Sequence, residues 1–320
     1  MSPAASRHQP LDVLTRLGLL ALFGLALAAS PPTPAAAAPA WQVATGIPPL
    51  GYLLERLTGG QAGVRVLVGP GQNPHTYEPT PRQRAALAQA KAYFKLGLPF
   101  ENTLLAKLNT GPEGLKVVDL AQGLELAPAP EEDHHHGDAR HGQKHQEEKD
   151  HDEGELDLHL WLSPRLTQHL VRAMAQALKD LDPAGAAGYD QRLQALLADL
   201  ERVDQHLAQV LAPHRGSYFL VYHPAFGYFG RDYGLKQVAV ETGGKEPGAR
   251  HLAGIIKKAR ERHIKVIFVQ PQFPQKSAQQ VAREIGGAVV AMDDLAPDYL
   301  ANLERLAREL DQGLKGQKRP

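Results

Sequence analysis

Short strand-like runs alternate with helical patterns from residue 41 onward, and this alternation restricts the chain to few folds. The first half has four such runs, at 41–45, 64–68, 92–98 and 115–120. The second half repeats the plan, with runs at 217–223, 236–241, 264–271 and 288–293. Strands that take turns with helices usually pair in parallel, so the sequence predicts two doubly wound α/β domains.

A long amphipathic helix separates the two halves. Leucines and valines recur on one stripe from 189 to 211, and Pro213 ends the pattern. We expect this helix to be a rigid strut between an N-terminal domain, 41–185, and a C-terminal domain, 213–320. The linking helix itself is predicted over 186–212.

The first 40 residues have the pattern of a secretory signal peptide. Arg7 and Arg16 precede an apolar run of 13 residues, 17–29, which is too short for a permanent membrane span. Ala-Pro-Ala at 38–40 fits the usual cleavage rule, so we expect cleavage near Ala40 and a mature start near Trp41.

The amino-acid composition limits which compartment the protein can occupy and which kinds of partner it can bind. The chain has no cysteine, which excludes disulfides, thiolate metal sites and a lipid-modified N-terminal cysteine. We therefore expect a free periplasmic protein, most simply a monomer. The chain has 35 basic and 35 acidic residues, so it has no net charge that would attract nucleic acid.

Residues 131–155 cannot form a core, because they hold six histidines, ten acidic residues and a single apolar residue, Ala139. They predict a disordered, solvated loop within the N-terminal domain. Such a loop is either a charged spacer or a weak, multi-site collector of metal ions, and its histidines favour the collector.

Three further histidines and one aspartate lie where a ligand would bind. His75 follows the run at 64–68, and His159 shortly precedes a helix that starts at Ser163 and Pro164. His223 and Asp293 end strands of the second half, at the sheet edge where ligands collect. Three imidazoles and a carboxylate suit zinc, although their wide spacing forms no local motif. The remaining histidines after residue 40 and outside the acidic loop are expected to be surface or capping residues: His169, His206, His214, His251 and His263.

Five stretches in order give a more specific signal. They are NPHTYEPTP, DLHLWLSP, YHPAFGYF, VQPQF and AMDDLAPDYLANL. Together they resemble the metal-binding solute-binding proteins of ABC transporters, in particular the zinc-binding, ZnuA-like branch. The resemblance covers about 41–315. It implies two α/β domains joined by one long helix, a divalent metal ion in the cleft, and delivery of that ion to a membrane permease.

By the same resemblance, His75, His159 and His223 are the imidazole ligands of Zn²⁺ and Asp293 is the fourth ligand. The family motif has a proline where this chain has Asp294, so either carboxylate could face the metal. Manganese members have a carboxylate in place of His223, which favours zinc here.

Three other functions fit parts of the pattern. A receptor for manganese or another divalent metal would have the same fold. A zinc hydrolase would need a base such as Glu78, which we instead expect to bond within the turn between Pro74 and Pro79. A surface adhesin of the same fold is a third alternative. We expect a binding protein with no catalytic residues.

Overall fold

The computed structural model describes residues 41–108, 114–129, 156–241 and 247–315. They all fall within one compact unit, Ala38–Pro320. The predicted signal peptide and the acidic, histidine-rich segment lie outside the described residues. Among the described residues, no helix is long and apolar enough to cross a membrane.

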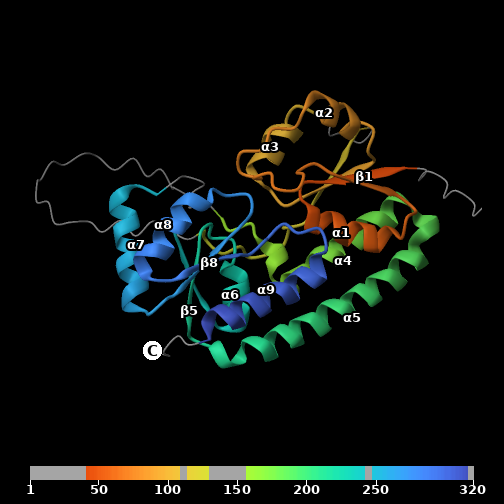
Figure 1. Ribbon diagram of the computed structural model, residues 1–320. Helices are drawn as coiled ribbons and strands as arrows, with labels where there is room; N and C mark the ends of the chain where they lie inside the picture. The colour runs from red at the N-terminus through yellow and green to blue at the C-terminus, as the bar shows by residue number, and fades with distance from the viewer. Residues whose placement is uncertain (1–40, 109–113, 130–155, 242–246, 316–320) are drawn as a thin grey trace, which may run out of the picture. The chain divides into compact units, whose positions relative to one another are not determined.

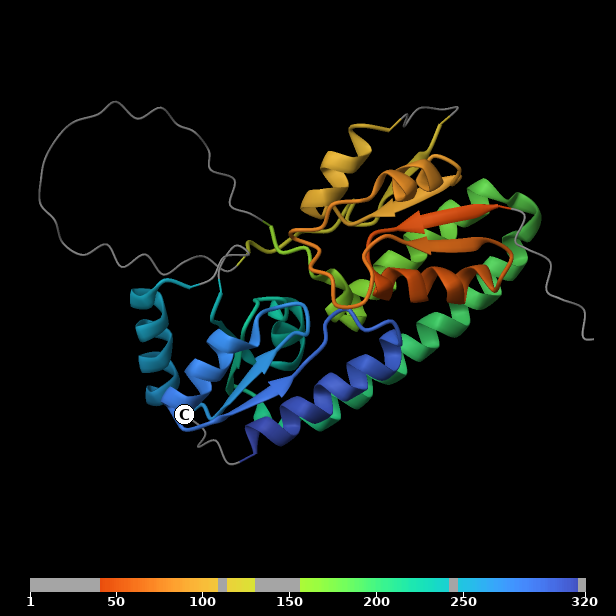
Figure 2. The ribbon, with the colours of Figure 1, turned by 45° about the horizontal axis from the view of Figure 1, so that its top comes forward.

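The first half forms a parallel sheet of four strands, in the order β2-β1-β3-β4. Its strands are β1 (Gln42–Thr45), β2 (Gly63–Val66), β3 (Ala92–Lys95) and β4 (Lys116–Asp119). Three helices connect them: α1 (Pro48–Thr58), α2 (Pro81–Leu87) and α3 (Pro99–Leu105). Helix α1 covers one face of this sheet and α2 and α3 cover the other (Figures 1 and 2).

Proline fixes where the helices of this half begin. α1, α2 and α3 start at Pro48, Pro81 and Pro99. Proline suits the first helical position because its missing N–H would have no partner inside the helix. α2 adds a capping box, in which Thr80 and Gln83 exchange hydrogen bonds at the helix start.

The second half repeats the arrangement in the order β6-β5-β7-β8, again all parallel. Its strands are β5 (Tyr218–Val221), β6 (Lys236–Ala239), β7 (Val266–Val269) and β8 (Ala288–Ala291). The helices are α6 (Gly227–Tyr233), α7 (Ala249–Glu261), α8 (Gln275–Ile285) and α9 (Tyr299–Leu314). The predicted strand and helix alternation is therefore confirmed in both halves.

Successive side chains of β5 point to opposite faces of the sheet and belong to two different apolar cores. Phe219 and Val221 belong to the larger core, which extends through α5, α9 and the first half, whereas Leu220 and Tyr222 face a smaller core under α7 and α8. Successive strand residues point to opposite faces of a sheet, so a run apolar at every position must be covered on both.

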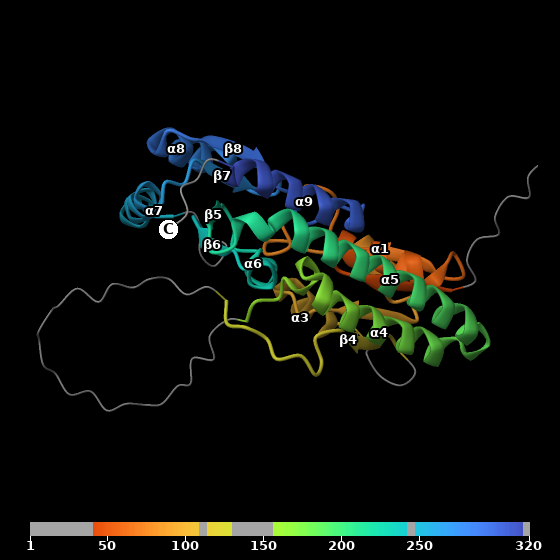
Figure 3. The ribbon, with the colours of Figure 1, turned by 90° about the horizontal axis from the view of Figure 1, so that it is seen from below.

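Two long helices tie the halves together. α4 (Pro164–Leu181) and α5 (Ala186–Leu211) form an antiparallel pair, and α5 lies between α4 and α9 (Figure 3). α5 has 26 residues, about 39 Å of helix at 1.5 Å per residue. It begins three residues before the stripe at 189–211, since Ala186, Ala187 and Gly188 have too little apolar surface to show in the pattern. The exact domain boundaries stay a prediction.

Candidate metal centre

His75 lies in the loop that follows β2, and side chains of the same loop hold it in place by hydrogen bonds. The Tyr77 hydroxyl donates to the carbonyl of Leu67 at 2.7 Å, and the backbone N–H of His75 donates to Asn73 Oδ1 at 2.9 Å. Tyr77 also packs edge-on against Phe100 of α3. The half-buried imidazole is thus directed by a turn fixed at both ends.

His159 precedes a short 3₁₀ turn, Leu160–Leu162, that leads into α4. Asp157 Oδ1 accepts from both the backbone N–H of His159 (3.0 Å) and its ring Nδ1 (2.8 Å). Trp161 next to it donates its indole N–H to the carbonyl of Asp294 at 2.7 Å, and Tyr299 of α9 donates to the Trp161 carbonyl at 2.6 Å. These bonds attach the His159 segment to the second half.

His223 comes two residues after the end of β5 and is only 3% exposed. Its backbone is held by Gln270, which accepts from its N–H and donates to its carbonyl. The ring stacks on Phe273, with centroids 4.7 Å apart, and its Nδ1 lies 2.7 Å from Glu241 Oε2.

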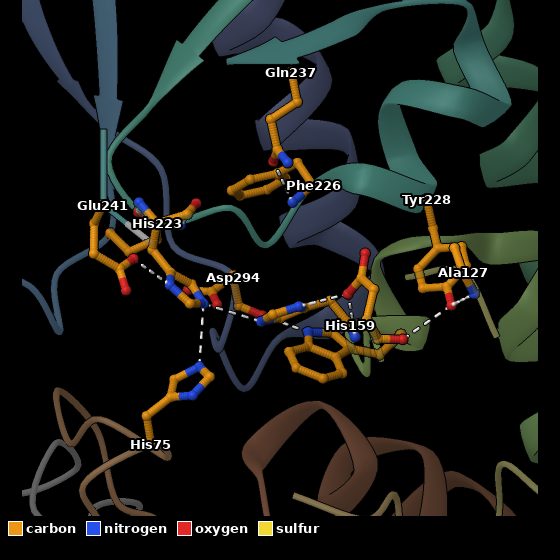
Figure 4. Close-up of polar contacts among 12 residues, drawn as sticks. His75, Ala127, His159, His223, Phe226, Tyr228, Gln237, Glu241 and Asp294 are labelled. Atoms are coloured by element: carbon orange, nitrogen blue, oxygen red, sulfur yellow. Dashed lines mark hydrogen bonds and ion pairs between the residues drawn. The ribbon is translucent and has the colours of Figure 1, made fainter. Parts of the chain in front are cut away.

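The three imidazoles converge through their Nε2 atoms (Figure 4). His223 Nε2 lies 3.2 Å from His75 Nε2 and 3.1 Å from His159 Nε2. The ligand atoms of all three lie within 4.8 Å of one another. Zinc–nitrogen bonds of about 2.0–2.1 Å separate two tetrahedral ligands by roughly 3.3 Å, so one zinc ion fits this spacing.

The environment lowers the pKa of His75 and His223 but raises that of His159. Burial, together with the neighbouring His223 and His159, lowers the pKa of His75 to about 3. Burial likewise holds the pKa of His223 well below its ordinary value. Burial acts in the same direction on His159, but the hydrogen bond to Asp157 and the charge of Asp157 outweigh it and raise its pKa.

Asp293 is not brought into this group of atoms. Its Oδ1 accepts from the backbone N–H of Leu295 (2.9 Å) and from Gln272 Nε2 (3.0 Å), so it caps the turn after β8. The adjacent Asp294 instead lines the small cavity that the three histidines share. Asp294 is 5% exposed, and its Oδ1 has no hydrogen-bond partner among the described residues. Burial raises the pKa of this carboxyl to about 7.

The five other histidines expected at surface or capping positions stand apart from the group. His251 fits the expectation, since its Nε2 bonds the Val240 carbonyl near the start of α7. For His214 the prediction was wrong, because its ring is buried and lies 2.9 Å from Asp311 of α9. The expectation for Glu78 also fails: it is exposed and forms no hydrogen bond within the described part of the chain, while Asn73 and Tyr77 hold the turn.

Sequence reasoning missed two carboxylates that contact the imidazoles, Asp157 and Glu241. A signal for each was present. Asp157 precedes His159 by two residues, and Glu241 follows β6, the strand that pairs with β5. The carboxyl ends of adjacent parallel strands lie at one sheet edge, which places Glu241 near His223.

Two parallel-sheet α/β units with a converged histidine triad between them define a two-lobed metal-binding protein. The chain belongs to the family described as zinc-uptake complex component A, periplasmic, whose model matches residues 43–313. This confirms the resemblance seen in the sequence.

Three similar proteins are matched over most of their length. The high-affinity zinc uptake system protein ZnuA of Yersinia pestis is 27% identical over 280 residues, covering 84% of this chain and 88% of that protein. A crystal structure of ZnuA is 37% identical with a TM-score of 0.74, covering 85% of this chain and 98% of the other. A zinc-bound ZnuA lacking residues 138–173 of its own sequence is 36% identical with a TM-score of 0.76, covering 87% and 99%.

Proposed function

We propose that the protein captures Zn²⁺ outside the cytoplasm and delivers it to a membrane ABC permease. His75, His159 and His223 bind the ion through Nε2. The observation that carries the proposal is their convergence, with His223 Nε2 3.2 Å from His75 Nε2 and 3.1 Å from His159 Nε2 although the residues are distant in sequence. The zinc-bound relative at 36% identity supports the same cargo.

Asp294 is the carboxylate that we assign as fourth ligand, in place of the Asp293 expected from sequence. Its Oδ1 is buried without a partner among the described residues, and it borders the histidine cavity. A buried carboxylate is costly without a partner, and a metal ion would supply one. Asp293 already accepts two hydrogen bonds through its Oδ1.

Zinc is favoured over manganese because nitrogen ligands favour the later first-row metals, whereas manganese prefers carboxylates. A receptor rather than a hydrolase is favoured because a hydrolase needs a base beside the metal. Glu78, the candidate base, lines a neighbouring surface cavity and not the one shared by the histidines.

Competitive metal titration of the purified protein tests the proposal. We expect one tight zinc ion per chain, with zinc preferred to manganese. His223→Ala should lower zinc affinity by orders of magnitude, whereas His206→Ala, on the surface of α5, should leave it unchanged. Manganese binding as tight as zinc, or equal effects of the two substitutions, would contradict the assignment.

The same titration distinguishes the two aspartates. Asp294→Asn should weaken zinc binding, while Asp293→Asn should mainly affect the turn after β8. The opposite ranking would restore Asp293 as the ligand.

A further inference from the structure

Two of the three imidazoles are each paired with a buried carboxylate on the ring nitrogen that faces away from the triad. His159 Nδ1 lies 2.8 Å from Asp157 Oδ1, and His223 Nδ1 lies 2.7 Å from Glu241 Oε2. The carboxylate side chains are only 4% and 1% exposed. In Figure 4, Glu241 lies to the left of the His223 ring and His75 lies below it.

A carboxylate in this position determines which ring nitrogen is free to bind a metal. An ionised carboxylate only accepts hydrogen bonds, so the imidazole must carry its proton on Nδ1. Nε2 then presents its lone pair to the other histidines. A neutral imidazole without such a partner divides between two tautomers, and only one of them has a free Nε2.

We propose that Asp157 and Glu241 are positioning residues, which hold His159 and His223 in the metal-binding tautomer and orientation before zinc arrives. This inference rests on the proposed zinc site and adds the groups that prepare it. His75 differs, because no hydrogen bond to its Nδ1 exists within the described residues, and it completes the site as the less constrained ligand.

Asp157 is itself held from both halves of the molecule. Its N–H donates to the Ala127 carbonyl at 2.9 Å, and its carbonyl accepts from the Tyr228 hydroxyl of α6 at 2.9 Å. The same hydroxyl accepts from the N–H of Ala127 (Figure 4). Gly227, at the start of α6, leaves the space for the carboxylate, since a Cβ there would lie 2.7 Å from Asp157 Oδ2.

Asp157→Asn and Glu241→Gln test the two pairs with little change of shape. Each amide can donate to Nδ1 and so favour the wrong tautomer. We expect zinc affinity to fall about 10- to 100-fold in each, the usual effect of removing such a partner. Asp204→Asn is the control, because Asp204 is also buried but bonds Arg165 and Tyr233 instead of a histidine.

Gly227→Ala offers a test that leaves every titratable group in place. Gly227 has no left-handed backbone angle, so alanine suits the helix, but the new methyl group must turn the Asp157 carboxylate away from His159. We expect weaker zinc binding with unchanged thermal stability. The control is Gly254→Ala in α7, where a Cβ meets no atom within 4 Å.

Nitrogen-15 NMR of the histidine rings separates positioning from a general loss of structure. In alkaline buffer without metal, the unsubstituted protein should have His159 and His223 protonated on Nδ1, and Asp157→Asn should change only His159. Folded variants with unchanged tautomers and unchanged zinc affinity would overturn the inference while leaving the zinc site intact. An unsubstituted protein that binds no zinc would instead overturn the proposed function.

Discussion

Each of the three histidines has a different electrostatic environment, and this changes how acid should release the metal. Three ordinary histidines would each take up a proton below pH ~6.5, giving an affinity that falls by about three log units per pH unit. Burial makes His75 and His223 poor proton acceptors, with the pKa of His75 near 3. Those two imidazoles are already neutral in mildly acidic solution.

Two groups should therefore govern the pH dependence of zinc binding. His159, with its raised pKa, must lose a proton, and so must Asp294, whose pKa is raised to about 7. Asp294 is protonated below about pH 7 and His159 below its raised pKa, so zinc affinity should fall as pH falls. Between pH ~5 and ~6.5 we expect the logarithm of zinc affinity to change by about two per pH unit.

In Asp294→Asn, the logarithm of zinc affinity should change by only about one per pH unit, because only His159 then releases a proton. The measurement is zinc affinity against pH in a non-coordinating buffer, with circular dichroism to show that the fold persists. A slope near three in the unsubstituted protein would mean that His75 and His223 titrate normally.

At the scale of single elements, one buried side chain fixes the junction between β3 and α3. Glu101, in the first turn of α3, is fully buried. Its Oε2 accepts from the N–H groups of Leu96, Gly97 and Leu98 at 2.8–3.0 Å. Its Oε1 accepts from the Tyr93 hydroxyl at 2.8 Å. The carboxylate thus takes the place of backbone acceptors where the strand has ended and the helix has just begun.

Glu101→Ala should lower the free energy of unfolding by several kcal/mol, since each unsatisfied buried polar group costs about 1–3 kcal/mol. Glu101→Gln should cost less, because its carbonyl oxygen can still accept from the backbone while its amide group donates to Tyr93. Chemical denaturation measures both. Zinc affinity in Glu101→Gln should stay near normal; if alanine and glutamine were equally harmful, shape rather than hydrogen bonding would be responsible.

On the scale of the whole molecule, the proposed ion would join segments from both halves. His75 follows a strand of the first sheet, His223 follows a strand of the second, and His159 leads into α4. Zinc bound only by the folded arrangement stabilises it by mass action, by about 2.7 kcal/mol when free zinc is 100 times its dissociation constant.

Thermal unfolding with and without zinc should show this stabilisation, and a chelator should reverse it. A chain without residues 131–155 should keep the full increase, while calorimetry should show that weaker additional zinc binding has disappeared. His223→Ala should remove the increase. Loss of the increase in the shortened chain would mean that the acidic segment supplies primary ligands.

The sequence alone determined the alternation of strands and helices, the two parallel sheets and the long helix, because periodicity and turn residues are local signals. It also placed His75, His159 and His223 at the ends of elements, and the family resemblance grouped them. Tertiary structure alone shows which carboxylates lie near the histidines. Asp293 and Asp294 are neighbours in the chain, but Asp293 caps the turn after β8, whereas Asp294 lines the cavity that the histidines share. Glu241 and His223 meet only because β5 and β6 pair in register. No local pattern encodes such contacts, since they depend on how distant segments pack.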